Sequence, residues 1–244
     1  MCQVYLSPLA GKSLTSYLKK RGCQLHFMKP LAGVAPPLAF HPDLLLCKLG
    51  VRDDAPVFCG DPSRLRPVYP GDILYNACCT GRYFIHNLKH TAPELLAACG
   101  IAASAPQKPA ASAAQVLPGA FHAPRLSPVP IIPVPVSQGY AKCSIVCVDE
   151  TSVITYDAGI TKACRKAGLH VLQISPKHVL LPGYPTGFIG GTGGRIGREI
   201  LFNGDLSSHP DFSAIRGFIE ERGLSCVFFD DYPLTDIGSI IFSP

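Results

Sequence analysis

The sequence contains no tryptophan and few charged residues, which make up 16% of its 244 residues. That fraction lies below the roughly 25% of an average globular protein, so the composition excludes a wholly disordered chain. The sequence also lacks a long apolar run: the most apolar stretch, residues 129–136, holds three prolines and is too short to cross a bilayer. The N-terminus has no basic start followed by an apolar stretch, as a secretory signal would. We therefore expect a soluble, cytoplasmic protein that does not act at a membrane.

Positive charge is neither strong nor concentrated. The formal net charge is +5, from 22 Lys and Arg against 17 Asp and Glu. The basic residues are scattered, and residues 19–21 are the only run of three. Nucleic-acid-binding proteins usually gather basic residues on one face and add aromatic side chains that stack on bases. The pattern therefore argues against a nucleic-acid partner.

The eleven cysteines contain no CxxC pair, so a zinc ribbon or a thioredoxin-like site is not indicated. Several of them lie inside apolar runs: Cys47, Cys99, Cys147 and Cys226. A reduced, buried cysteine behaves as a small apolar side chain. We expect free thiols in the core, and neither a metal nor a cofactor.

Glycine and proline are abundant, with 23 and 24 residues, which predicts many short elements and turns rather than a helical bundle. Residues 102–136 stand apart because they contain nine Ala and eight Pro. We interpret the chain as a single domain, 1–244, with an irregular peripheral insertion at about 102–127. The end of this segment, residues 131–136, could still form a strand at a sheet edge, where proline is tolerated.

The rest of the chain repeats one pattern, in which a helical stretch ends in a glycine and runs directly into a strand. Helices are predicted near 11–22, 92–99, 158–167 and 211–222, with their glycines at Gly22, Gly100, Gly168 and Gly223. Asp157 and Asp211 are expected to be N-caps of two of them. Strand pairs are predicted at 143–148 with 152–155 and at 73–75 with 83–86, and single strands at 44–49 and 198–202. This predicts an α/β fold, and an ordinary mixed sheet with helices on both faces would show the same pattern.

Residues 139–194 resemble the last module of the dimethylarginine dimethylaminohydrolases. The shared features are a hairpin of two apolar strands, a helix that leads through Lys166-Ala167-Gly168 into a strand, and a terminal Gly-Gly loop. Residues 69–73 resemble the acid-bearing Gly-Asp strand of that family. A bacterial branch of the same fold shares QGYAKCS at 138–144 and the FNGD and HPD segments after residue 201. The resemblance implies a pentein fold, which is an α/β propeller of five ββαβ modules with its active site in a central channel.

The same resemblance implies that the usual catalytic centre is missing. Those enzymes attack the guanidinium carbon with a cysteine just after the Gly-Gly turn, and this position falls at Gly194. Tyr69 and Pro70 occupy the place of the acid that orients the guanidinium. The general-base histidine would fall in the Ala/Pro-rich insertion, where His122 lies in no matching motif. The resemblance thus implies a pseudoenzyme, because these residues cannot form the covalent intermediate.

His-Pro-Asp occurs twice, at 41–43 and 209–211. A histidine and an aspartate can act together as a general base and the group that orients it. Alternatively, the triplet simply begins an element, because proline fixes φ and aspartate caps a helix. The second interpretation is favoured for His209, which precedes a predicted helix. Both remain open for His41 and Asp43.

Cys143 follows a lysine, and a neighbouring cation can lower the pKa of a thiol, although a free cysteine is more often core packing. It is the first candidate nucleophile if catalysis survives, with His41 as the base and Asp43 as the acid, or with His209 or Asp205 in their place. Asn203 and Asp205 follow a predicted strand and could reach a ligand, but Asn203-Gly204 is also a turn dipeptide.

The glycine-rich segment 187–197 does not match a phosphate-binding loop. It either lines a ligand pocket, with Gly191 and Gly194, or forms a tight turn. We therefore predict a non-catalytic protein that binds a small polar or cationic ligand at Asp205, Asn203, His209, Gly191 and Gly194. The alternative is a cysteine-dependent hydrolase or amidinotransferase acting on a guanidine-like substrate. A third hypothesis is that the insertion binds a partner as extended polyproline. The sequence does not indicate an oligomeric state.

Overall fold

A computed structural model describes residues 2–102 and 130–244. The insertion predicted at about 102–127 falls, apart from its first residue, outside the described residues. Its irregular, peripheral character therefore stays a prediction. The described residues form five small β-sheets and a set of short helices. This is a mixed α/β fold, as the sequence predicted.

Four of the five sheets repeat one topology. The first strand pairs antiparallel with the second, a helix follows the second strand, and the third strand pairs parallel with the second. In three sheets these elements follow one another along the chain, whereas in the fourth the first strand is supplied by the C-terminal end. The four units are β14, β1, α1 and β2 (Ile241–Ser243, Gln3–Leu6, Lys12–Lys20, Gln24–Phe27); β5, β6, α2 and β7 (Cys78–Cys79, Tyr83–His86, Pro93–Ala98, Ile132–Pro135); β8, β9, α4 and β10 (Val146–Cys147, Ser152–Thr155, Ala158–Lys166, His170–Gln173); and β11, β12, α5 and β13 (Gly193–Ile196, Glu199–Phe202, Phe212–Glu220, Ser225–Val227).

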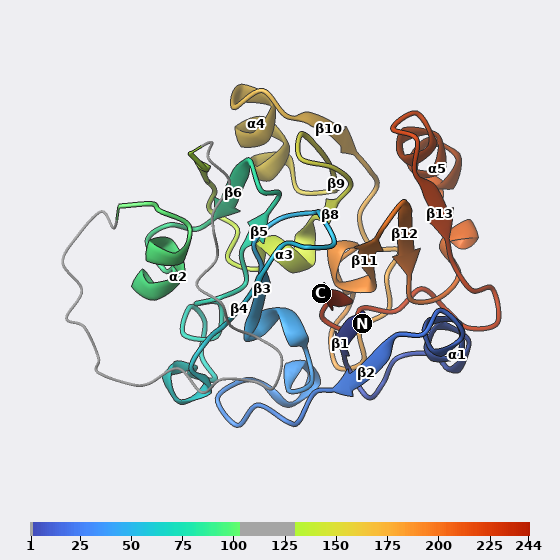
Figure 1. Cartoon of the computed structure of the whole chain (residues 1–244), viewed down its shortest axis with the longest axis horizontal. Coiled ribbons are helices and arrows are strands. Elements are labelled where there is room, and N and C mark those ends of the chain that lie inside the picture. Colours follow the sequence, from blue (N-terminus) through green and yellow to red (C-terminus); the bar gives the residue numbers. More distant parts are fainter. Residues whose placement is uncertain (1, 103–129) are drawn as a thin grey trace.

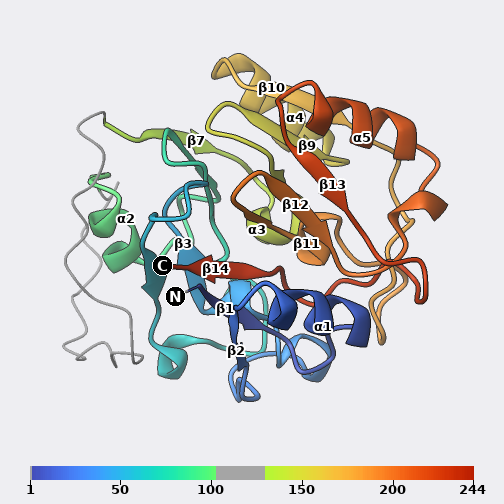
Figure 2. The same ribbon diagram turned by 45° about the vertical axis from the view of Figure 1, so that its right-hand side comes forward.

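The fifth sheet contains only the antiparallel strands β3 (Leu46–Lys48) and β4 (Val57–Cys59). Helix α3 (Ala141–Ser144) is a single turn that precedes β8. Figure 1 shows α1, α2, α4 and α5 at the outside of the molecule, with α3 and the first strands nearer the middle. Figure 2 shows β14 beside β1, close to the N-terminus. Short 3₁₀ helices connect these elements: η1 (Pro36–Leu38), η2 (Pro42–Leu44), η3 (Pro62–Arg64), η4 (Gly190–Thr192) and η5 (Leu206–Ser208).

The predicted helix–glycine–strand pattern is present. Each of the four peripheral helices is followed by a glycine with φ between +67° and +93°, at Gly22, Gly100, Gly168 and Gly223. An L-residue with a Cβ rarely adopts this conformation, so glycine is what allows the chain to reverse there. The predicted N-cap at Asp157 is confirmed, since its carboxylate accepts a hydrogen bond from the Ile160 N–H at 2.7 Å. The edge strand predicted at 131–136 is β7, which lies at the edge of its sheet.

Two predicted strands and one cap were wrong. Residues 141–144 form a helical turn, so that only Val146–Cys147 of the predicted strand 143–148 pairs with β9. Residues 73–76 form a turn closed by the Asn76 N–H and the Ile73 carbonyl, and the strand that pairs with β6 is Cys78–Cys79. Asp211 precedes α5 without capping it, because its carboxylate accepts from the Ser175 N–H instead.

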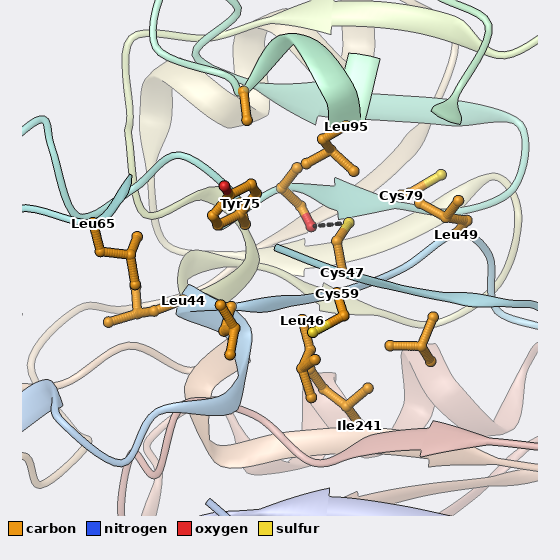
Figure 3. Packing of buried hydrophobic residues seen from close by; sticks show 14 of the residues in the cluster. Leu44, Leu46, Cys47, Leu49, Cys59, Leu65, Tyr75, Cys79, Leu95 and Ile241 are labelled. Atoms are coloured by element: carbon orange, nitrogen blue, oxygen red, sulfur yellow. Dashed lines mark hydrogen bonds between the residues drawn. The ribbon is translucent and has the colours of Figure 1, made fainter. Parts of the chain in front are cut away.

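The largest core cluster lies where β3, β5 and α2 meet, and Figure 3 shows its packing. Leu46 and Cys47 of β3 pack there with Tyr75 and with Leu95 of α2. The Cys47 thiol donates to the Ala77 carbonyl oxygen at 3.3 Å, and burial raises the pKa of Cys47 well above its usual range. Each fully buried leucine contributes roughly 2 kcal/mol to folding. All eleven cysteines are free thiols and eight of them are buried, as the sequence predicted.

Protonation of a buried histidine should make the fold sensitive to acid. His86 of β6 is fully buried, donates from Nε2 to the Gly139 carbonyl at 3.0 Å and contacts Thr91 Oγ1 through Nδ1 at 2.7 Å. Burial lowers the pKa of His86 from 6.5 to about 4. Below pH 6.5 the unfolded chain therefore binds a proton at this histidine that the folded chain does not. The free energy of unfolding consequently decreases as the pH is lowered. The loss attributable to His86 is roughly 2 kcal/mol at pH 5 and nothing above pH 7.

Urea unfolding of the wild type and of His86→Gln at pH 7.5 and pH 5.0 measures this difference. Asp236 has the opposite effect on the pH dependence of stability, because burial raises its pKa from 3.8 to about 6. Its contribution to the free energy of unfolding therefore increases as the pH is lowered. That contribution is common to both proteins and cancels in the comparison. The exposed His170→Gln is the control and should retain the wild-type pH dependence. An unchanged pH dependence in His86→Gln would contradict the prediction.

Candidate functional site

A group of buried polar side chains lies in the segments that directly precede the first strands of the sheets. Four of these strands are β3, β5, β8 and β14, and the fifth, β11, is preceded by the glycine-rich turn η4. Polar side chains come from each of the first four segments, so residues far apart in sequence meet in one place. We name this group the Asp43 cluster; its members are His41, Asp43, Asn76, Lys142, Cys143, Asp236 and Ser239.

Asp43, in the short helix η2 that precedes β3, is the centre of the cluster and is fully buried. Its Oδ2 accepts hydrogen bonds from Ser239 Oγ at 2.6 Å and from Cys143 Sγ at 3.1 Å. Lys142 Nζ donates to the same Ser239 oxygen at 2.9 Å. A single hydroxyl therefore bridges the ammonium group of Lys142 and the buried carboxylate. The nearby positive charge offsets part of the free-energy cost of burying the carboxylate.

Asn76 joins the Asp43 segment to α3. Its Nδ2 donates to the Asp43 carbonyl oxygen at 3.1 Å and to Cys143 Sγ at 3.3 Å. Its Oδ1 accepts from the backbone N–H groups of Lys142 and Cys143. All polar groups of this side chain are paired, which fixes the position of the thiol. Asn76 was not predicted from the sequence, although a polar residue inside the apolar run 73–79 is an available signal.

Asp236 is the second buried carboxylate. It accepts from the backbone N–H groups of Phe188 at 2.9 Å and Gly238 at 3.0 Å, and its Oδ1 lies 3.9 Å from His41 Nδ1. Burial raises the pKa of Asp236 to about 6, which the two N–H groups oppose. Gly191 packs directly on this carboxylate: a Cβ at that position would lie 1.9 Å from Asp236 Oδ1.

The charges in the cluster favour a protonated thiol and a neutral imidazole. Burial raises the pKa of Cys143 well above its usual range, and the carboxylates of Asp43 and Asp236 add to this effect. Burial lowers the pKa of His41, which Asp43 partly opposes. A thiolate is therefore not favoured, and the thiol proton is directed at a carboxylate rather than at the imidazole.

Two polar atoms of the cluster have no hydrogen-bond partner among the described residues: His41 Nδ1 and Asp43 Oδ1. Such atoms are uncommon in a folded interior, and they lie beside the thiol. His41, Asp43 and Cys143 each offer one ligand atom within 4.8 Å of the other two. Imidazole, carboxylate and thiolate are the ligand types of zinc, so these three residues could hold a metal ion.

The structure thus brings together the three residues proposed for catalysis from the sequence. Of the residues proposed for ligand binding, only Gly191 lies at the cluster. Asn203 holds chain segments together: its Oδ1 accepts from the Gly11 N–H and its Nδ2 donates to the Thr235 carbonyl. Asp205 caps η5 through the Ser207 N–H, and the His209 ring contacts His178.

Gly194 of β11 lines a separate cavity of about 50 Å³. Each of the five first strands contributes residues to its wall: Leu46 and Lys48 of β3, Cys78 and Cys79 of β5, Val146 and Cys147 of β8, Gly193 to Arg195 of β11, and Ile241 and Phe242 of β14. A Cβ at Gly194 would lie 2.1 Å from the Ile240 carbonyl oxygen, so the backbone leaves no room for a side chain at this position.

Comparison with protein-family models gives one family. Residues 52–103 and 129–241 match a family of unknown function, DUF6873. The match covers more than half of the chain, which therefore belongs to this family. Asn76, Cys143, Asp236 and Ser239 lie within the matched residues, whereas His41 and Asp43 precede them. No curated protein and no solved structure matches the chain. No helix among the described residues is long and apolar enough to span a membrane.

Proposed function

We propose that the five sheets form a pentein-type α/β propeller, with the Asp43 cluster as its ligand site. Support for the propeller comes from the topology shared by four sheets and from the cavity to which all five first strands contribute. The resemblance of residues 139–194 to the last module of guanidine-modifying enzymes points the same way. On this proposal the cluster and the cavity both lie along the central channel.

The proposed ligand is a small cation of the guanidine class. The observation that carries this proposal is the pair of buried carboxylates, Asp43 and Asp236, which flank His41 with Lys142 as the one cation of the cluster. Asp43 Oδ1 accepts no hydrogen bond from residues 2–102 or 130–244, so it can accept one from a ligand. A planar guanidinium presents several N–H donors to carboxylates and compensates their buried charge. The role of the site would be recognition without turnover, because the thiol is held protonated.

A second function is favoured by one observation, the position of Cys143 Sγ 3.1 Å from Asp43 Oδ2. A cation bound between the carboxylates would offset their effect on the thiol and so lower the pKa of Cys143. The thiol proton could then pass to Asp43 and from there to the departing nitrogen, while Sγ bonds to the guanidinium carbon and a C–N bond breaks to release an amine. Water, or an acceptor amine, would then displace the thiol from the resulting thiouronium carbon. This would make the protein a cysteine-dependent hydrolase or amidinotransferase.

Methylguanidinium at low millimolar concentration is expected to bind the wild type, as measured by isothermal titration calorimetry. Asp43→Asn and Asp236→Asn should each weaken binding at least about tenfold, because each removes a charged acceptor. The exposed Asp54→Asn is the matched control and should bind as the wild type does. Absence of binding to the folded wild type, or an equal loss in Asp54→Asn, would remove the support for this site.

Alkylation with 2-chloroacetamidine, followed by mass spectrometry, separates recognition from catalysis. Recognition alone predicts that Cys143 reacts no faster than the other buried thiols. Rapid labelling of Cys143 that methylguanidinium blocks would instead establish the enzymatic function. Iodoacetamide, which is uncharged, gives the reference rate for accessibility alone.

A further inference from the structure

The cavity enclosed by the first strands has a strongly positive wall. Among the described residues that line it, three are cationic, Lys48, Lys142 and Arg195, and none is acidic. They come from β3, α3 and β11, so three separate segments place their charges around one space. The cavity volume of about 50 Å³ corresponds to room for about three to five water-sized groups.

Lys142 is linked through the Ser239 hydroxyl to the carboxylate of Asp43, whereas Lys48 and Arg195 have no such link to a carboxylate within the described residues. None of the three forms an ion pair with a carboxylate within 4 Å among the described residues. Arg195 donates to the carbonyl oxygens of Val148 and Gly197, and Lys142 donates to Ser239. Lys48 Nζ is buried and has no hydrogen-bond partner in the same set of residues.

The titratable groups around Lys48 do not replace a counter-ion. Burial lowers the pKa of Lys48, as does Arg195, whereas Asp53, Cys2 and Cys147 raise it. Asp53 is exposed and its Oδ1 already accepts from the Gly197 N–H at 2.8 Å. Like charges in a space screened from water repel one another more strongly than on the surface, and an anion between them removes this cost.

We propose that this cavity is a binding site for a small oxyanion, of the size of a carboxylate or an inorganic phosphate group. The ammonium group of Lys48, which donates to no other described residue, would donate hydrogen bonds to the anion. Lys142 and Arg195 would supply further positive charge. The remaining lining is largely apolar, with Leu46, Val146 and Ile240 among it, so water competes poorly there. The site is distinct from the Asp43 cluster, with which it shares only Lys142.

Thermal unfolding tests the proposal with sodium formate and sodium phosphate as the probes, at a constant ionic strength set with sodium gluconate. Each probe stabilises the native protein by RT ln(1 + L/Kd), where L is the probe concentration, so Tm should rise with concentration. Lys48→Met should weaken the apparent affinity for the oxyanion at least about tenfold. Lys89→Met, which removes an exposed lysine elsewhere, should behave as the wild type. Crystals soaked in sodium bromide should show the anomalous signal of bromide in the cavity.

The outcomes separate this proposal from the cation site. Lys48 lies outside the Asp43 cluster, so Lys48→Met should still bind methylguanidinium if that site exists. A Tm in formate and phosphate equal to that in gluconate, for a wild type that is folded, overturns the proposal. So does an equal Tm rise in the wild type and a folded Lys48→Met variant, because the anion would then bind elsewhere.

Discussion

Replacing Gly191 by alanine is expected to destabilise the protein by at least about 3 kcal/mol. The added Cβ would lie 1.9 Å from Asp236 Oδ1 and 2.4 Å from its Cγ, and both Gly191 and Asp236 are buried. Moving the carboxylate would break its hydrogen bonds to Phe188 and Gly238. Overpacking of this kind commonly costs 1–3 kcal/mol, and an unpaired buried carboxylate adds to it, hence roughly 3 kcal/mol or more.

Gly217 of α5 provides the matched control. It lies in a helix interior, and a Cβ there would meet no atom within 4 Å. Gly217→Ala should therefore stabilise the protein by about 0.5–1 kcal/mol, through the higher helix propensity of alanine. Both variants are compared by chemical denaturation. A Gly191→Ala protein with the wild-type midpoint would show that the carboxylate of Asp236 is not held as described.

Removal of the Asp43 side chain should cost about 3 kcal/mol. Asp43→Ala deletes the acceptor of both the Ser239 hydroxyl and the Cys143 thiol, and it leaves the nearby Lys142 without its counter-charge. Breaking a buried charged network by removing one partner costs about 3–5 kcal/mol. Asp43→Asn keeps one acceptor oxygen and should therefore lose less stability than Asp43→Ala.

Asp205→Ala serves as the comparison for Asp43, because Asp205 only caps the short helix η5 at the surface. Loss of such a cap costs about 1 kcal/mol. Denaturation in urea at pH 7.5 ranks the variants. If Asp43→Ala were no more damaging than Asp205→Ala, the Asp43 cluster would not be a closely coupled network.

The local parts of the fold were accessible from the sequence. A helix followed by a left-handed glycine depends on residues within a few positions, and the four glycines from Gly22 to Gly223 marked all four peripheral helices. The strands 73–75 and 143–148 were misplaced for a non-local reason. Asn76 holds those two segments together by hydrogen bonds across 66 and 67 residues, and this pairing overrides their apolar strand pattern.

The same distinction applies to the candidate site. Cys143, His41 and Asp43 were selected by residue type and by their neighbours, and the structure brings them together. Asn203, Asp205 and His209 carry the same kind of polar groups, but those groups are used within turns and between chain segments. The link between Lys142 and Asp43 could not be recognised, because the hydroxyl that joins them belongs to Ser239, which lies 196 residues after Asp43.

The pairing of β14 with β1 also sets an order of assembly during synthesis. Gln3 pairs with Ser243, so this sheet gains its first strand only after residues 241–243 have left the ribosome. Closing a loop of this length is entropically costly and is among the slower steps in folding. Asp236 and Ser239 lie in the segment that leads into β14, and they therefore reach Asp43 and Cys143 at the same late stage. Burial of the Cys143 thiol is thus a chemical marker that synthesis has passed β14, since a shorter nascent or truncated molecule would leave the thiol open to alkylation.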